Sequence, residues 1–79
     1  MITGTRQAVL RAIRPVTLHG HAAVDLRFVF LDDDTEQLQS ARVSPGVASP
    51  HLQPDDHILV EYKTAEVVRV VLLKVGERA

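Results

Sequence analysis

The segment Val67–Leu73 constrains the fold of this chain more than any other part of the sequence. Six of its seven residues are valine or leucine, and only Arg69 is polar. Valine loses rotamer freedom in a helix and packs well on a pleated strand, so the segment predicts a strand over Glu66–Val75. Alternation along this strand places apolar side chains on both of its faces. One face alone can line the interior of a 79-residue barrel, and the second face therefore predicts an interface.

The rest of the chain is also rich in residues that favour strands. It contains twelve valines, three isoleucines and five threonines. Prolines and turn residues divide it into five expected strands, over Arg6–Arg14, Ala22–Leu31, Glu36–Val43, His57–Tyr62 and Glu66–Val75. Pro15 cannot donate a hydrogen bond to a sheet and is expected to end the first strand. The third strand is the most polar and is expected at an edge.

Alternation in the second expected strand identifies part of the core. The residues on one of its faces are apolar, namely Val24, Leu26, Phe28 and Phe30. This pattern predicts that both phenylalanines are buried. The connections contain residues that suit turns: Gly20, which tolerates a positive φ angle, lies within Val16–His21, and three aspartates lie within Asp32–Thr35.

The segment Ser44–Asp56 separates the third and fourth expected strands. Its three prolines exclude an uninterrupted helix or strand. A single helical turn there would place Val47 and Leu52 against one end of a barrel. Three meander strands, this Pro-rich crossover and a final hairpin follow the order of a five-stranded OB-like barrel. We therefore expect residues 1–79 to form one small all-β barrel domain; an SH3-like barrel, with its helical turn before the last strand, is the alternative.

Parts of the sequence resemble a family of short bacterial β-domains of unknown function. The matching segments are Ala8–Pro15, Val24–Phe30, Leu52–Tyr62 and Val67–Val71. Such domains are often found beside membrane helices and are similar to the soluble OB domain of NfeD-type membrane proteins. The resemblance implies a barrel with an interaction role and contributes no catalytic residues. Where the family pattern has a glycine before the fourth strand, this chain has Asp55, so we expect a type I turn led by Pro54.

The residues capable of catalysis or metal binding have simpler explanations. His19 and His21 are spaced to share a metal ion, but a zinc site needs three or four ligands and the other two histidines lie in separate segments. Asp32–Asp34 and Asp55–Asp56 are typical of turns and lack the ligand spacing of a calcium loop. The chain has no cysteine, no Gly-rich phosphate loop and no nucleophile elbow. We expect no enzyme, no metal site and no cofactor.

Charge and hydropathy argue against two kinds of partner. Nine Lys and Arg residues against ten Asp and Glu residues give a formal charge of −1, which provides no general attraction to nucleic acid. Met1–Arg6 lacks the pattern of a signal peptide. The apolar run Val67–Val75 is interrupted by two basic residues and is too short to cross a bilayer. A cytoplasmic location without membrane insertion is expected.

Two functional hypotheses remain. The first is a module that associates with itself or with a partner protein through an outer apolar face, formed by Val67, Val71, Leu73, Leu59, Val29 and Leu31. The second is a single-stranded nucleic-acid-binding OB-type domain, with contacts from Arg11, Arg27, Arg42 and Arg69. The chain has only three aromatic rings, and the alternation places two of them in the core. This favours the first hypothesis, since such OB domains stack bases on exposed rings.

Overall fold

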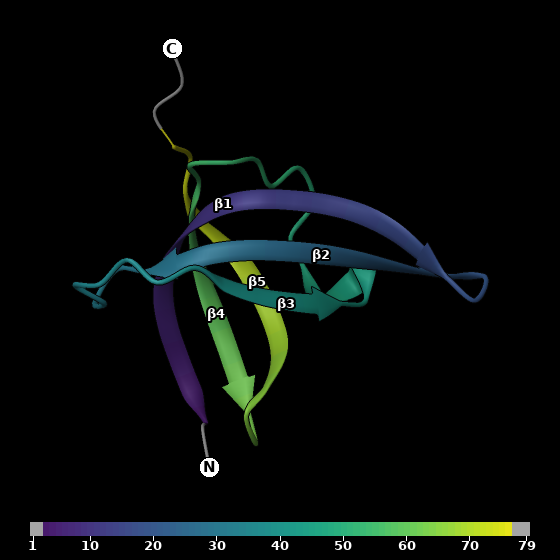
Figure 1. Cartoon of the computed structure of the whole chain (residues 1–79), viewed down its shortest axis with the longest axis horizontal. Coiled ribbons are helices and arrows are strands. Elements are labelled where there is room, and N and C mark those ends of the chain that lie inside the picture. The colour runs from purple at the N-terminus through teal and green to yellow at the C-terminus, as the bar shows by residue number, and fades with distance from the viewer. Residues whose placement is uncertain (1–2, 77–79) are drawn as a thin grey trace.

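Residues 3–76, which the computed structural model describes, form five antiparallel strands and one short helical turn. In chain order the elements are β1 (Gly4–Leu18), β2 (His21–Phe30), β3 (Gln39–Val43), the 3₁₀ turn η1 (Pro45–Val47), β4 (His57–Lys63) and β5 (Glu66–Lys74). The strands make one sheet in the order β3-β2-β1-β4-β5 (Figure 1). The all-β prediction is confirmed, and the third strand lies at an edge as expected. The sheet is not closed into a barrel, because β3 and β5 form its two ends.

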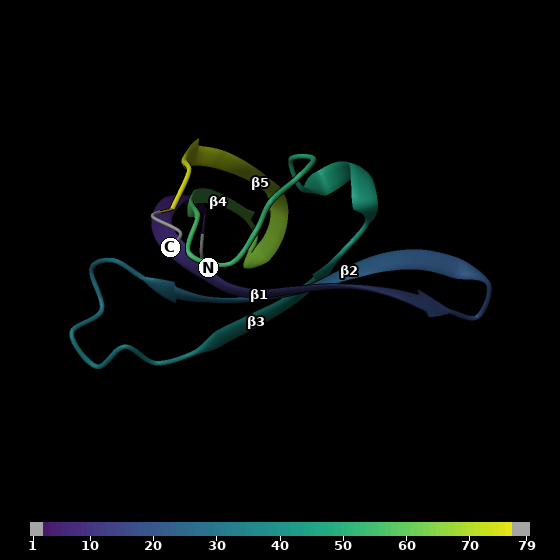
Figure 2. The same cartoon turned by 90° about the horizontal axis from the view of Figure 1, so that it is seen from above.

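The sheet folds over on itself because β1 is long and contains a β-bulge. β1 pairs with β4 through Gly4–Val9 and with β2 through Ala8–Leu18. The register with β2 shifts between Leu10 and Ala12, which leaves Arg11 as the extra residue. A bulge bends its strand and increases the local twist. Figure 2 shows the result: β4 and β5 lie in one layer, above β1, β2 and β3.

The hydrophobic core lies between these two layers. Its buried residues are Ala8, Leu10, Leu26, Phe28, Phe30, Val43, Leu52, Ile58, Val60 and Val70. Phe28 is 1% exposed and its ring meets that of Phe30 edge to face, with 5.4 Å between the centroids. The alternation predicted for the second strand is therefore confirmed. Leu52 from the crossover belongs to the core and Val47 packs against it, as expected.

The first strand is longer than expected, and the expectation that Pro15 ends it is wrong. β1 continues to Leu18, with Pro15 paired to Val24 of β2. β4 pairs with β1 only as far as Val9, so the second half of β1 has β2 as its single neighbouring strand. Proline is compatible with a strand where its missing N–H would point away from the sheet.

Tight two-residue loops close the β1–β2 and β4–β5 hairpins. His19 and Gly20 connect β1 to β2 with φ angles of 50° and 78°, the arrangement of a type I′ turn, whose twist matches that of the flanking strands. Gly20 thus lies where a positive φ angle is required, although the turn is shorter than the expected Val16–His21. Thr64 and Ala65 connect β4 to β5 with φ angles of 53° and 64°.

The loop after β2 is organised by an aspartate, as its sequence predicts. The Asp33 carboxylate accepts hydrogen bonds from the backbone N–H of Thr35 at 2.9 Å and from its hydroxyl at 2.6 Å. These bonds, that from the hydroxyl most of all, lower the pKa of Asp33 from its ordinary value of 3.8. The loop is longer than expected, because β3 begins at Gln39 and not at Glu36.

The turn before β4 differs from the expected type I turn. A hydrogen bond of 3.2 Å from the N–H of Asp56 to the carbonyl of Gln53 closes it. Pro54 and Asp55 are the central residues, and the φ angle of 76° at Asp55 makes the turn type II. Aspartate tolerates the left-handed region, so the absence of glycine does not exclude this turn. Asp56, expected as a turn residue, is only 1% exposed. Its carboxylate accepts hydrogen bonds from the N–H groups of Gln53 and Gly76, both at 2.9 Å.

Candidate interaction surface

One row of residues crosses the outer face of the sheet, the side turned away from the core. Val71 of β5 pairs with Leu59 of β4, which pairs with Gln7 of β1. The N–H of Leu31, directly after β2, donates a hydrogen bond to the carbonyl of Gln7 at 3.0 Å. Cross-strand partners share a face, and four neighbouring residues on the other face are fully buried, namely Ala8, Ile58, Val60 and Val70. We call Val71, Leu59, Gln7 and Leu31 the central row. Leu31 is 49% exposed, while Leu59 and Val71 are half-buried.

A second row lies beside the central row; it is apolar at Val29 and Val9 and continues through His57 to Lys74. Val9 of β1 pairs with Val29 of β2 on one side and with His57 of β4 on the other. Val9 and His57 are half-buried, whereas Val29 is only 8% exposed. On the opposite side of the central row, Glu61 of β4 pairs with Arg69 of β5. The two rows are therefore bordered by a charged pair.

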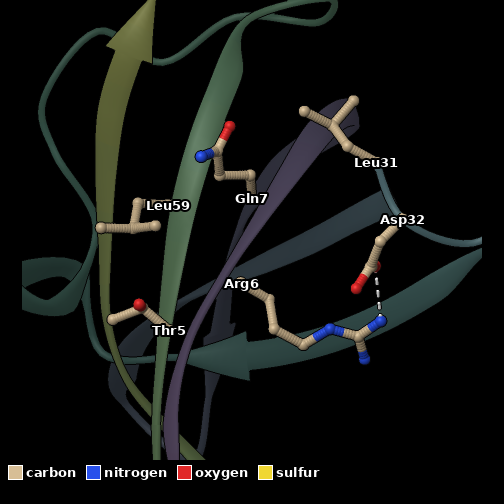
Figure 3. A pocket seen from close by; sticks show the side chains of 6 residues that line it. All are labelled: Thr5, Arg6, Gln7, Leu31, Asp32 and Leu59. Atoms are coloured by element: carbon tan, nitrogen blue, oxygen red, sulfur yellow. Dashed lines mark hydrogen bonds and ion pairs between the residues drawn. The ribbon is translucent and has the colours of Figure 1, made fainter.

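A shallow depression of about 390 Å³ opens on this face between β4 and the end of β2. Figure 3 shows Leu59 and Leu31 on either side of Gln7, with Arg6 directed toward Asp32. An Arg6 guanidinium nitrogen lies 2.7 Å from the Asp32 carboxylate. The same guanidinium lies 3.6 Å from the centroid of the Phe30 ring. Arg6 therefore covers the edge of the core beside the depression.

Four of the six predicted interface residues lie together on this face: Val29, Leu31, Leu59 and Val71. Val29 contributes little accessible surface, since it is only 8% exposed. The sequence prediction missed Gln7 and Val9. Their alternation with buried Ala8 and Leu10 is the signal that identifies their face.

Two β-bulges in β5 separate the other predicted residues from this face. Arg69 pairs with Glu61 but Val67 pairs with Tyr62, so Val68 is an extra residue. Val67 consequently packs against the core and does not lie beside Val71 on the outer face, so its role in an interface stays a prediction. Leu73 is the extra residue at the second bulge and is exposed near the end of β5. Strict alternation does not continue across a bulge, which is why the pattern failed here.

The four arginines of the nucleic-acid hypothesis do not form one stripe. Arg27 of β2 and Arg42 of β3 lie near one another around Asp25. Arg11 lies at the bulge of β1, with a guanidinium nitrogen 3.7 Å from the carboxylate of Asp55. Arg69 is on β5, at the far end of the sheet. The rings that would stack bases are not available either, since both phenylalanines are buried and Tyr62 packs against the core.

Asp25 and Arg42 form the closest ion pair on the β2–β3 side of the sheet. Nε and Nη2 of Arg42 donate hydrogen bonds of 2.6 and 2.9 Å to the two carboxylate oxygens of Asp25. These hydrogen bonds are the main reason that the pKa of Asp25 is lowered from its ordinary value of 3.8, with further lowering by the charges of Arg42, Arg14 and Arg27. The same pair raises the pKa of Arg42.

Replacing Arg42 with glutamine is expected to raise the pKa of Asp25 toward 3.8. Because the folded-state pKa is below the unfolded-state value, the pair stabilises the fold above the unfolded-state pKa. That stabilisation is lost as the pH falls through the folded-state pKa. Titration of the carboxyl carbon by NMR measures this change, with Arg69→Gln as the control that leaves Asp25 unaltered. An Asp25 pKa that does not move in Arg42→Gln would contradict the assignment.

The two histidines whose spacing would allow them to share a metal ion, His19 and His21, lie at the tip of the β1–β2 hairpin. His19 is in the turn and His21 begins β2, and both are exposed. Within residues 3–76 no group of three or more histidine, aspartate or glutamate side chains is arranged to hold a metal ion. His57 lies apart from them, in the second row.

Comparison of the chain with protein-family models, curated proteins and solved structures finds no match. No helix within residues 3–76 has the length and apolar character needed to cross a membrane.

Proposed function

We propose that the protein is a non-enzymatic self-association module in which two copies pack the outer faces of their sheets together. The central row carries this proposal. It presents Val71, Leu59 and Leu31 in a line across the sheet, and Val9 extends the apolar surface into the next row. Val71 and Leu59 are direct neighbours, and Gln7 separates them from Leu31. Accessible apolar residues that gather on one face mark an interaction site more often than scattered ones do.

The arrangement of the rows suits a second copy of the same chain. Two sheets that pack face to face interdigitate apolar side chains across about 10 Å. A two-fold axis along the central row brings that row against its own copy, which is the self-complementary contact that a symmetric dimer requires. The additional apolar surface buried between two copies is important for a chain of this length, because a domain of about 60 residues buries only about 60% of its unfolded surface on folding alone.

We also propose that the open sheet has an OB-like architecture. The helical turn η1 lies between β3 and β4, where an OB-type barrel has its capping element. The segment after η1 reaches β5, where Ser49 donates a backbone hydrogen bond to the carbonyl of Val70 at 2.8 Å. β3 and β5 line a common depression of about 400 Å³, which supports a partly open barrel. The two-residue loop between β4 and β5 supports the OB-like order over the SH3-like one, because an SH3-like barrel has a helical turn before its last strand.

Val71→Asp tests the self-association. A carboxylate in the central row would lose its hydration in the interface without gaining a hydrogen bond or an opposite charge. We therefore expect dimer affinity to fall at least about a hundredfold. Sedimentation equilibrium over a range of concentrations measures the change. The variant is expected to keep the fold, because the Val71 side chain is already partly in water.

Leu18→Asp is the matched control. Leu18 is 39% exposed and lies near the tip of the β1–β2 hairpin, which projects away from β4 and β5 in Figure 1. The dimer affinity of the Leu18→Asp variant should equal that of the unmodified chain. A strictly monomeric unmodified chain at high concentration, or equal losses in both variants, would overturn the proposal.

A further inference from the structure

A group of arginines surrounds one aspartate on the outer face of β1, β2 and β3, away from the central row. Asp25 of β2 pairs in register with Arg14 of β1 and with Arg42 of β3. Arg27 lies two residues further along β2, on the same face. Strand spacing places the three arginine Cα atoms within about 10 Å of one another. We call Arg14, Arg27 and Arg42 the arginine cluster.

The arginine cluster makes this part of the surface positive although the whole chain is slightly negative. Three guanidinium groups face one carboxylate, whereas the chain as a whole has a formal charge of −1. Arg42 is paired with Asp25. Arg14 and Arg27 are exposed and form no salt bridge with any residue in the described range 3–76. Their donors are therefore open to a ligand.

A depression of about 340 Å³ lies between β2 and β3, at the Arg27 and Arg42 side of the arginine cluster. Its lining includes Asp25, Arg27, Arg42 and Ser40. Ser40 of β3 pairs in register with Arg27 of β2. A guanidinium presents paired N–H donors that match the oxygens of a phosphate. The Ser40 hydroxyl supplies a neutral hydrogen-bonding group beside them.

We propose that the arginine cluster binds phosphate groups, with Arg14 and Arg27 as the principal donors. The described aromatic rings pack in or against the core, so the ligand is recognised through its phosphates and not through base stacking. Both a small polyphosphate and the backbone of a nucleic-acid strand carry this chemistry. The site lies on a different part of the sheet from the central row and does not depend on self-association.

The test uses two probes at low salt: fluorescently labelled oligo-dT by anisotropy and inorganic pyrophosphate by calorimetry. Arg27→Gln is expected to weaken binding about tenfold, because it removes charge-assisted hydrogen bonds. Arg69→Gln is the matched control, since it removes the same charge from an exposed position on β5, and binding should change by less than about twofold. Asp25→Asn is expected to tighten binding, because it removes the one negative charge at the centre of the arginine cluster.

Salt dependence gives a second measurement for the oligonucleotide. Two arginine–phosphate contacts, from Arg14 and Arg27, predict that log K falls with log salt with a slope of about −1.4, and Arg27→Gln should reduce the size of this slope by about 0.7. Binding of either probe with this pattern of variants supports the proposal, and the probe that binds identifies the source of the phosphate. Failure of both probes to bind more tightly than about 1 mM would overturn it. Equal weakening by Arg27→Gln and Arg69→Gln would overturn it as well.

Discussion

Replacing Asp56 with alanine is expected to lower the free energy of unfolding by about 3 kcal/mol, which corresponds to a melting temperature about 15 °C lower. Asp56 connects three parts of the chain. Its carboxylate accepts hydrogen bonds from Gln53 in the preceding turn and from Gly76 after β5. Its backbone carbonyl accepts a hydrogen bond of 2.9 Å from Leu10 of β1.

The size of this effect follows from burial. Asp56 is 1% exposed, so removal of its carboxylate leaves N–H donors of the turn and of Gly76 without their acceptor. Thermal and urea unfolding followed by circular dichroism measure the loss. Asp34→Ala is the control, because Asp34 is exposed in the β2–β3 loop and its replacement should change stability by less than about 0.5 kcal/mol. If Asp56→Ala lowered the free energy of unfolding by no more than Asp34→Ala does, the carboxylate would not stabilise the end of β5.

Replacing Gly76 with alanine is expected to cost about 2 kcal/mol and to lower the melting temperature by about 10 °C. A Cβ atom at this position would overlap the backbone carbonyl of Asp55. Backbone atoms in a closed turn cannot move aside as a flexible side chain does. The end of β5 must therefore separate from the turn, which also breaks the hydrogen bond to Asp56.

Gly46→Ala is the control for this substitution. Gly46 lies in η1, and an added Cβ there would have no atom within 4 Å. Its replacement should be neutral or slightly stabilising. Because Gly76→Ala and Asp56→Ala remove the same hydrogen bond, the double variant should lose less stability than the sum of the two single changes. Full additivity would contradict the shared contact, and an unaffected Gly76→Ala would contradict the close approach to Asp55.

Features of the fold that depend on nearby residues could be predicted from the sequence. The buried face of β2 follows from simple alternation, and Leu26, Phe28 and Phe30 are all in the core. Gly20 marks the turn of the first hairpin because few residues other than glycine adopt positive φ angles readily. The same local reasoning failed at Asp55, where aspartate adopts the positive φ angle expected of glycine.

Features that depend on pairing between distant segments could not be predicted. The faces of β5 were assigned by alternation, but the bulge at Val68 turns Val67 toward the core. The arginine cluster includes Arg14, which the sequence placed at the end of a strand before Pro15. The long β1 pairs Arg14 with Asp25, and β3 brings Arg42 to the same carboxylate. No spacing along the chain indicates this convergence.

The sequence by itself determined that the protein is all-β, which face of β2 is buried and where the first hairpin turns, because side-chain alternation and φ preferences act within a few residues. The tertiary structure alone decided which apolar residues share the outer face, that Asp56 is buried, and which arginines lie together. Strand order, register and bulges set these relations, and each is fixed by hydrogen bonds between segments far apart in the chain. The apolar segment Val67–Leu73 illustrates the local and the long-range contributions. Its composition predicts a strand, while its two bulges distribute the side chains between the core and the surface.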